Sequence, residues 1–220
     1  MTDHKKEIIQ SISRHKLITI LRNVPVDKLL PLVQALYAGG IRLLEITYSA
    51  DGHVSDEDTA RQIGLVAEEF RGRMFVGAGT VLTCRQAELT AEVGGCFIIS
   101  PNADPQVIQR TCQLDMVSIP GCMTPSEIVS AHQSGADFVK LFPASALGPD
   151  YIKAITAPLS HIKLLAVGGI HDGNMEQYRK AGVCGFGIGT NIIDKKLLAE
   201  NDYAGIEDLA KRYVAAAIGG

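Results

Sequence analysis

The chain has 220 residues, of which 46% are hydrophobic and 20% charged, and its formal net charge at pH 7 is −3. Nucleic-acid-binding domains normally carry a basic stripe, so we expect no nucleic-acid partner. No apolar run approaches the roughly 20 residues needed to cross a bilayer, and the polar N-terminal sequence is unlike a signal peptide. We therefore expect no membrane partner and a cytoplasmic location.

The five cysteines are scattered along the chain, without a CxxC pair or a neighbouring group of histidines. An odd number of cysteines without a secretory signal favours reduced thiols. We interpret them as small buried side chains and predict no metal site.

The first predicted element is a short N-terminal helix with Ile8, Ile9 and Ile12 on one face. Eight continuous apolar runs follow, and their starts lie 20 to 33 residues apart, which leaves room for one strand, one helix and two loops each time. Such runs are typical of parallel strands buried on both faces. The predicted strands are 17–22, 41–47, 74–77, 96–100, 116–119, 138–142, 163–167 and 184–188.

Helix boundaries fit this alternation. The segment from Thr124 to Glu127 has the pattern of a capping box with Pro125 at the first helical position. A last helix over 206–218 carries an apolar stripe that should close the fold. Glycines that would end helices in the left-handed conformation follow several helical runs; they are Gly39-Gly40, Gly94-Gly95, Gly135 and Gly182.

This pattern predicts an α/β fold: a single (β/α)8 TIM barrel with a short N-terminal helix, forming one domain over residues 1–220. The main alternative is a doubly wound open sheet. That fold usually has fewer units and a dinucleotide-binding fingerprint, and no GxGxxG motif follows the first predicted strand.

Three charged residues interrupt or end apolar strands: Arg22, Glu45 and Lys140. Catalytic groups of a barrel sit at the C-terminal ends of its strands, so these side chains are expected to converge on one mouth. The alternative is a structural ion pair inside the barrel. Charges are rarely buried unless they are paired or functional, and the presence of three on different strands favours a catalytic site.

The residue types suggest a specific chemistry. Burial lowers the pKa of a lysine, and the free amine of Lys140 could then attack a ketone to form an iminium. Glu45 could take and return the protons that carbon–carbon cleavage requires. Arg22 could hold a substrate carboxylate with two parallel hydrogen bonds.

Glycine-rich turns follow the last two predicted strands, where many barrels bind phosphate on exposed backbone amides. These turns contain Gly168, Gly169, Gly189 and Thr190, and together they predict a phosphate site. Residues 77–82 after the third predicted strand suggest another tight turn, from which Thr80 would point to the pocket or cap the next helix.

Read in order, the motifs ILR, LEIT, GAGTVL, SPN, PGCMTPSE, VKLFPAS, AVGGI and GIGT resemble the 2-keto-3-deoxy-6-phosphogluconate (KDPG) aldolase family, which includes the KDPGal and 4-hydroxy-2-oxoglutarate aldolases. The resemblance extends from Ile18 to about Asn191.

The resemblance implies a class I aldolase that cleaves a phosphorylated 2-keto acid to pyruvate and glyceraldehyde 3-phosphate, without metal or cofactor and as a homotrimer. It implies that Lys140 forms the Schiff base, that Glu45 transfers protons and that Thr80 contacts the pyruvyl part. It also implies a phosphate cradle of Gly168, Gly169 and Thr190.

Two departures leave the substrate open between gluconate and galactonate epimers and 4-hydroxy-2-oxoglutarate. Many KDPG-type members carry an Arg shortly after the catalytic Glu, where this chain has Tyr48-Ser49, and Arg22 resembles the galactonate-type arrangement. The acidic segment from Tyr48 to Ala60 is longer than in typical relatives. We interpret it as a loop, either a solvated insertion or a lid or neighbour contact that alters specificity.

Two other functions remain as alternatives. One is an epimerase or decarboxylase barrel of the ribulose-phosphate type, although no strand here has the DxK pattern of those enzymes. The other is a barrel that only binds a sugar phosphate, which the presence of Lys140, Glu45 and Arg22 disfavours.

Overall fold

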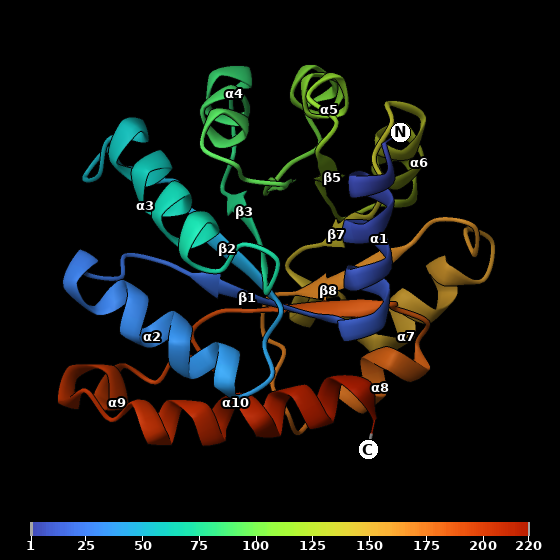
Figure 1. Cartoon of the computed structure of the whole chain (residues 1–220). Coiled ribbons are helices and arrows are strands. Elements are labelled where there is room, and N and C mark those ends of the chain that lie inside the picture. The colour runs from blue at the N-terminus through green and yellow to red at the C-terminus, as the bar shows by residue number, and fades with distance from the viewer. Residues whose placement is uncertain (1, 220) are drawn as a thin grey trace.

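Nine short parallel strands form one sheet that curls into a nearly closed barrel, with helices around its outside (Figure 1). The computed structural model describes residues 2–219, so the ends of the predicted domain over 1–220 lie outside the described residues. The sheet order is β5-β4-β3-β2-β1-β9-β8-β7-β6. The strands are β1 (Leu17–Leu21), β2 (Leu43–Thr47), β3 (Phe75–Gly79), β4 (Phe97–Ile99), β5 (Val117–Ile119), β6 (Gly121–Cys122), β7 (Val139–Leu141), β8 (Leu164–Val167) and β9 (Gly185–Ile188).

The sheet has nine strands rather than eight because β6 is a short extension of β5. Only Pro120 separates β5 from β6, and β5 pairs with β4 while β6 pairs with β7. The two pieces thus occupy one position of the barrel wall. Each of the eight predicted apolar runs overlaps a strand, and the predicted barrel is confirmed.

The helices are α1 (Asp3–His15), α2 (Val26–Ala38), α3 (Asp56–Glu69), α4 (Cys84–Glu92), α5 (Pro105–Gln113), α6 (Pro125–Gln133), α7 (Ala144–Thr156), α8 (Met175–Lys180), α9 (Lys195–Glu200) and α10 (Tyr203–Ile218). The capping box at Thr124 is confirmed, and Thr83 with Gln86 forms a second one at α4. Left-handed glycines also follow helices as predicted, at Gly40, Gly94, Gly135 and Gly182.

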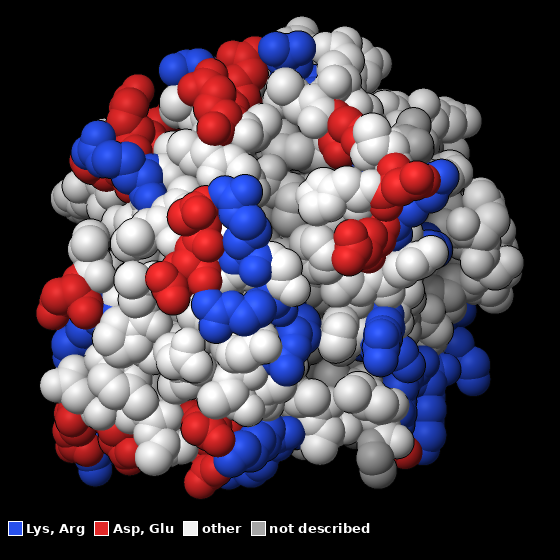
Figure 2. Space-filling model, viewed as in Figure 1, with Lys and Arg blue, Asp and Glu red and all other residues white. Residues whose placement is uncertain are grey.

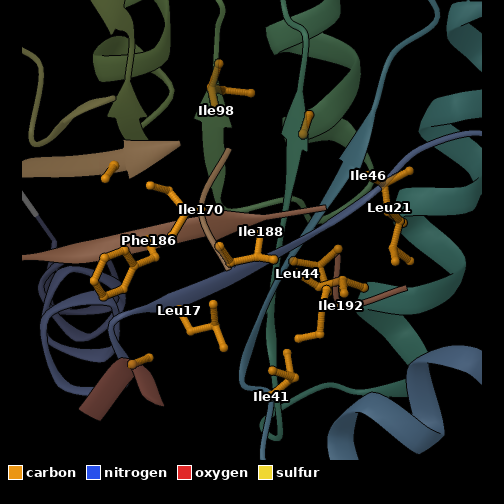
Figure 3. Packing of buried hydrophobic residues seen from close by; sticks show 14 of the residues in the cluster. Leu17, Leu21, Ile41, Leu44, Ile46, Ile98, Ile170, Phe186, Ile188 and Ile192 are labelled. Atoms are coloured by element: carbon orange, nitrogen blue, oxygen red, sulfur yellow. The ribbon is translucent and has the colours of Figure 1, made fainter. Parts of the chain in front are cut away.

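Two apolar cores result from the alternation of side chains along each strand. The larger core lies between the strands and the outer helices, and Figure 3 shows part of it, including Leu44 and Phe186. The smaller core fills the barrel interior, where Ile8 and Ile12 of α1 belong to the same cluster as Phe97 of β4 and Phe138, which directly precedes β7. The predicted N-terminal helix is therefore a plug.

A buried ion pair also fixes this plug. Lys5 Nζ of α1 lies 2.9 Å from Oδ2 of Asp137, a residue just before β7. Asp137 in turn accepts a hydrogen bond from the Ser118 backbone N–H.

Figure 2 shows acidic and basic side chains intermixed over the visible face of the molecule. No helix among residues 2–219 has the length and apolar character that a membrane crossing requires.

Two local predictions were wrong. The third strand runs to Gly79, so Gly77 and Gly79 lie inside the strand and only Thr80, with φ of 57°, makes the turn. The predicted loop from Tyr48 to Ala60 is also shorter, because α3 begins at Asp56. Ser55 caps this helix, and three acidic residues in its first turn interact favourably with the helix dipole.

Candidate active site

A cavity of about 490 Å³ opens at the C-terminal ends of the barrel strands. All eight predicted site residues line it, so one mouth brings together side chains and turns that are up to 168 positions apart in the sequence, from 22 to 190. They are Arg22, Glu45, Thr80, Lys140, Gly168, Gly169, Gly189 and Thr190.

Glu45 reaches the cavity from the middle of β2. Its side chain is only 2% exposed, and Oε2 has no hydrogen-bond partner among the described residues. The adjacent strand makes room for it: a Cβ atom at Gly79 would overlap the Glu45 carboxylate. Burial raises the pKa of Glu45 above its ordinary value, and the positive charges of Lys140 and Arg22 oppose that shift. A raised pKa makes such a carboxyl better suited both to take and to return a proton.

Lys140 comes from the centre of β7 and is 7% exposed. Burial is the main influence on the pKa of its ammonium group and lowers it; the Glu45 carboxylate opposes this shift, and Arg22 adds to it. The Lys140 Nζ lies 4.6 Å from the centre of the Phe142 ring, close to the cavity wall. A larger fraction of Lys140 is therefore the neutral, nucleophilic amine than for an exposed lysine.

Arg22 and Thr80 stand together at the rim. Arg22 directly follows β1 and is exposed, and its Nη2 donates a hydrogen bond to Thr80 Oγ1 at 3.5 Å. Arg22, Glu45 and Lys140 are the charged residues of the cavity lining. Arg22 is thus placed to hold an anionic group beside the buried amine.

Among residues 2–219, no three His, Cys, Asp or Glu side chains are grouped so that they could hold a metal ion.

The two glycine turns line the cavity, and their carbonyl oxygens are bonded elsewhere. Gly169 O accepts from Asn174 Nδ2, and Gly189 O accepts from the N–H groups of Ile192 and Ile193. The N–H groups of Gly169, Gly189 and Thr190 have no acceptor in the part of the chain that the structure describes. Free amides that converge in this way are typical of anion sites.

Glycine is required at one position of these turns for two reasons. Gly169 has φ of 75°, which L side chains rarely adopt, and a Cβ atom there would overlap Ser145 of α7. The Ser145 N–H also donates to Gly168 O at 3.0 Å, which fixes the turn against the start of that helix.

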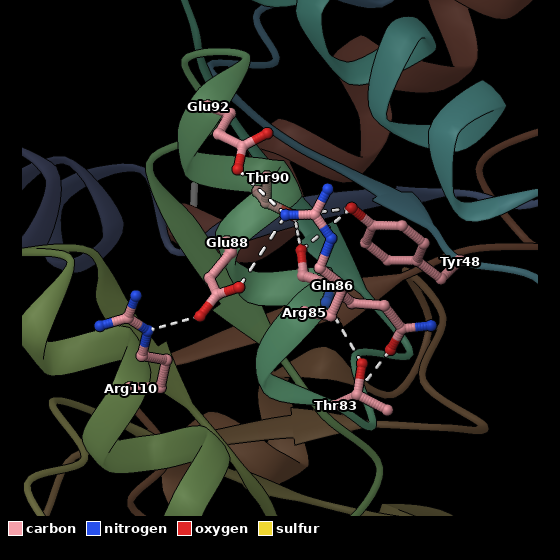
Figure 4. A network of polar contacts seen from close by, with 8 residues as sticks. All are labelled: Tyr48, Thr83, Arg85, Gln86, Glu88, Thr90, Glu92 and Arg110. Carbon is pink, nitrogen blue, oxygen red and sulfur yellow. Dashed lines mark hydrogen bonds and ion pairs between the residues drawn. The ribbon is translucent and has the colours of Figure 1, made fainter.

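Tyr48 points away from the cavity, although it lies only three residues beyond Glu45. Its ring is buried, and its hydroxyl group lies 3.1 Å from Gln86 O and 3.0 Å from Thr90 Oγ1 of α4 (Figure 4). Its N–H donates to Gly79 O at 2.9 Å. Tyr48 therefore connects the end of β2 to β3 and α4 through hydrogen bonds. It contributes no charge to the mouth.

Several lining residues escaped sequence reasoning: Ile20, Phe142, Val167 and Asn191. Strand periodicity could have identified Ile20 and Phe142, because they lie two positions from Arg22 and Lys140 and share their face. Asn191 gave no such signal; its Nδ2 donates to Ile170 O at 2.9 Å and joins the two glycine turns.

Comparisons with known proteins agree with this geometry. The family model for KDPG and KHG aldolase matches residues 8–209. The chain is 37% identical to a probable 2-dehydro-3-deoxy-6-phosphogalactonate aldolase of Rhizobium meliloti, over 80% of this chain and 81% of that protein. It is 36% identical to the 2-dehydro-3-deoxy-6-phosphogalactonate aldolase of Escherichia coli, over 80% and 83%.

Among solved structures, a native KDPGal structure has a TM-score of 0.80 and 34% identity, covering 91% of this chain and 95% of that one. The KDPG aldolase of Legionella pneumophila, with pyruvate captured as a covalent carbinolamine intermediate, has a TM-score of 0.83 and 26% identity, covering 95% and 97%. On these findings, the chain belongs to the KDPG and KHG aldolase family.

Proposed function

We propose that this chain is a class I aldolase that cleaves a 2-keto-3-deoxy-6-phospho sugar acid to pyruvate and glyceraldehyde 3-phosphate. The observation that carries the proposal is a buried lysine of lowered pKa, Lys140, facing the same cavity as the buried carboxyl of Glu45. The aldolase names of the relatives and the covalent pyruvate adduct of the Legionella pneumophila structure support it.

The proposed reaction begins with attack of the Lys140 amine on the C2 carbonyl; loss of water gives a protonated iminium. The Glu45 carboxylate takes the proton of the C4 hydroxyl group, the C3–C4 bond breaks, and its electron pair moves toward the iminium. The aldehyde leaves and an enamine remains on Lys140. Glu45 then returns the proton to C3, and water hydrolyses the iminium to release pyruvate.

In this proposal the two ends of the substrate bind to different parts of the mouth. Arg22 and Thr80 hold the carboxylate, because a guanidinium offers parallel donors to such a group. The free amides at Gly169, Gly189 and Thr190, with the close backbone of Gly168, hold the phosphate.

Of the two epimers, we propose the galactonate type as the preferred substrate. The phosphogalactonate aldolases are 36–37% identical to the chain, against 28–33% for relatives that are phosphogluconate or KHG/KDPG aldolases. The position where many gluconate-type members carry an Arg is close to Tyr48, whose side chain is committed to α4. Comparison of kcat/KM for the two epimers tests this choice.

We also propose that the protein is a homotrimer in the cytoplasm. A designed protein cage made by fusing symmetric oligomeric domains has a TM-score of 0.82 to this chain and 33% identity, covering 91% of this chain and 71% of that one. The reduced state of the five cysteines fits a cytoplasmic location. Light scattering should give three times the chain mass of 23.6 kDa, and a single chain mass would contradict the trimer.

The deciding experiment is borohydride trapping with pyruvate, followed by peptide mass spectrometry. We expect a reduced pyruvyl adduct on Lys140 in the wild type and no adduct in Lys140→Met. The exposed Lys153 of α7 offers a matched control, and Lys153→Met should trap pyruvate like the wild type. Absence of an adduct under saturating pyruvate would rule out the Schiff-base mechanism.

A further inference from the structure

A second cavity of about 480 Å³ adjoins the catalytic cavity behind the turn that follows β9. The two cavities share Ile20, Arg22, Gly189 and Thr190 in their walls. The second one extends between the start of α2 and the short helix α9, which lie next to each other at one side of the barrel (Figure 1). We call it the annex. No step of the proposed lyase reaction uses its far wall.

The charged residues of the annex are all basic. Its lining contains Arg22, Lys28 and Lys195 and no acidic residue. Among residues 2–219, none of these three cations lies within ion-pair distance of a carboxylate, although the chain as a whole has a net charge of −3. Three basic groups around one cavity repel each other, so an anion between them would be stabilised.

A cavity at the opposite end of the barrel shows the contrast. It has a similar volume of about 500 Å³ and also contains arginines, but Arg71 and Arg73 pair there with Glu68 and Glu69. The lining of that cavity also contains two carboxylates, Glu7 and Glu68, whereas the lining of the annex contains none. The annex is thus distinguished by its uncompensated charge rather than by its size.

The position of Lys28 is fixed by the structure. Its Nζ donates to Leu198 O at 2.8 Å and to Ala199 O at 3.1 Å, which leaves one N–H of the ammonium group free. Apolar residues such as Val24 and Ile193 form other parts of the wall. Apolar walls reduce the screening of Lys28, which is half-buried, whereas Arg22 and Lys195 are exposed at the edge of the cavity.

The annex and the catalytic cavity share the turn that carries the free amides of Gly189 and Thr190. Gly189 and Thr190 line both cavities, so a phosphate group could be passed from one side of this turn to the other without leaving cationic surroundings. We propose that the annex is an additional subsite for a phosphate-class anion, held by Lys195 and Lys28, with Arg22 on the wall that it shares with the catalytic cavity. This inference goes beyond the proposed lyase reaction, and its first test needs no turnover.

The test is calorimetric titration of the full-length protein with inorganic phosphate in a low-salt, phosphate-free buffer. We expect two phosphates per chain in the wild type: one on the glycine turns and one in the annex. Lys195→Gln should weaken the annex phosphate about three- to tenfold, because it removes one of the charges around it. Lys28 is kept intact, since its loss would also release α9.

Lys196 offers a matched control, because it is the next residue of α9, is exposed and lies outside the lining of the annex. Lys196→Gln should bind phosphate like the wild type. Binding of only one phosphate per chain by the wild type, or equal affinities in the two variants and the wild type, would overturn the inference.

A second arm separates two sources of the anion. The titration is repeated with saturating glyceraldehyde 3-phosphate, the proposed product. If the annex receives the phosphate of the substrate, the Lys195-dependent binding of inorganic phosphate disappears. If it serves a separate anion, that binding persists with its affinity unchanged. Both results support the subsite and assign its source, and neither depends on cleavage activity.

Discussion

The opposite pKa shifts of Glu45 and Lys140 have one physical origin, since both side chains are buried in the same mouth. Burial disfavours the charged form of each, which raises the pKa of the acid and lowers that of the amine. Arg22 stands closer to solvent, at the rim of the mouth. The three residues thus combine a free nucleophile, a carboxyl able to exchange protons and a fixed cation.

The charges of Glu45 and Arg22 act on the pKa of Lys140 in opposite directions. Their removal should therefore shift the pH dependence of imine formation in opposite directions. Trapping at limiting pyruvate should decline as the pH falls through the lowered pKa of Lys140, because the amine becomes protonated. Glu45→Gln removes a negative charge that raises this pKa, so the decline should move to lower pH. Arg22→Gln removes a positive charge that lowers it, so the decline should move to higher pH.

The measurement is the initial rate of borohydride trapping between pH 4 and 9, with Lys153→Gln as an exposed-charge control. Glu45→Gln should in addition slow cleavage by about 10² to 10⁴, because proton transfer is lost. Shifts of both variants in the same direction would contradict the electrostatic account. Equal loss of trapping and cleavage in Glu45→Gln would assign a structural role to Glu45.

A substitution at Gly79 tests by steric displacement whether cleavage depends on the position of the Glu45 carboxyl. Gly79→Ala places a methyl group where the Glu45 carboxylate lies, so we expect cleavage to fall by about 10² or more while pyruvate trapping persists. Ala78→Gly is the control, because Ala78 belongs to the same strand but to the outer core. Steady-state cleavage rates and trapping are compared in both variants. Unchanged cleavage in Gly79→Ala would show that Glu45 has another productive position.

At the scale of elements, strand periodicity was sufficient to predict the barrel and most of the mouth. Arg22, Glu45 and Lys140 stood out because charge within an apolar strand is costly. The sequence did not reveal why Gly77 and Gly79 are glycines: they were read as a turn, yet they make room for Phe97 and Glu45 on neighbouring strands. That constraint depends on pairing between strands, which local patterns do not contain.

Neither the helix that begins at Asp56 nor the annex could be predicted from the sequence pattern. The helix start at Asp56 was hidden because acidic residues in a first helical turn look like a polar loop. Lys28 and Lys195 lie 167 positions apart, on different helices, and became a cluster only once α2 and α9 were side by side. Surface lysines are common, so neither residue was conspicuous by itself.

Tyr48 connects three elements, and its hydroxyl group allows a measured test of that connection. Tyr48→Phe removes the contacts with Gln86 O and Thr90 Oγ1, which should lower the free energy of unfolding by about 0.5–1.5 kcal/mol and leave kcat unchanged. Tyr203→Phe is the control, because its hydroxyl makes one exposed contact with Asn201. Urea unfolding measures both. Equal stability of Tyr48→Phe and wild type would show that the connection contributes nothing.

At the scale of the whole molecule, the barrel separates stability from catalysis along its axis. The mouth carries uncompensated charges and free backbone amides, whereas the opposite end is closed by α1 with Ile8, Ile12 and the buried pair of Lys5 and Asp137. Substitutions of residues at the two ends of the barrel should therefore have different effects. Changes at the mouth should alter chemistry, and changes at the plug should alter the free energy of unfolding.

Ile12 tests this separation. Its side chain is 1% exposed inside the barrel, so Ile12→Ala should leave a cavity and lower the free energy of unfolding by about 2–5 kcal/mol. Ile9→Ala should cost clearly less, since Ile9 is only half-buried on the same helix. Urea denaturation measures both variants. Below the unfolding transition, Ile12→Ala should trap pyruvate on Lys140 at the wild-type rate, because no residue of α1 lines the mouth. A slower rate in fully folded Ile12→Ala would show instead that the packing of the barrel interior transmits strain to β7 and moves the lysine.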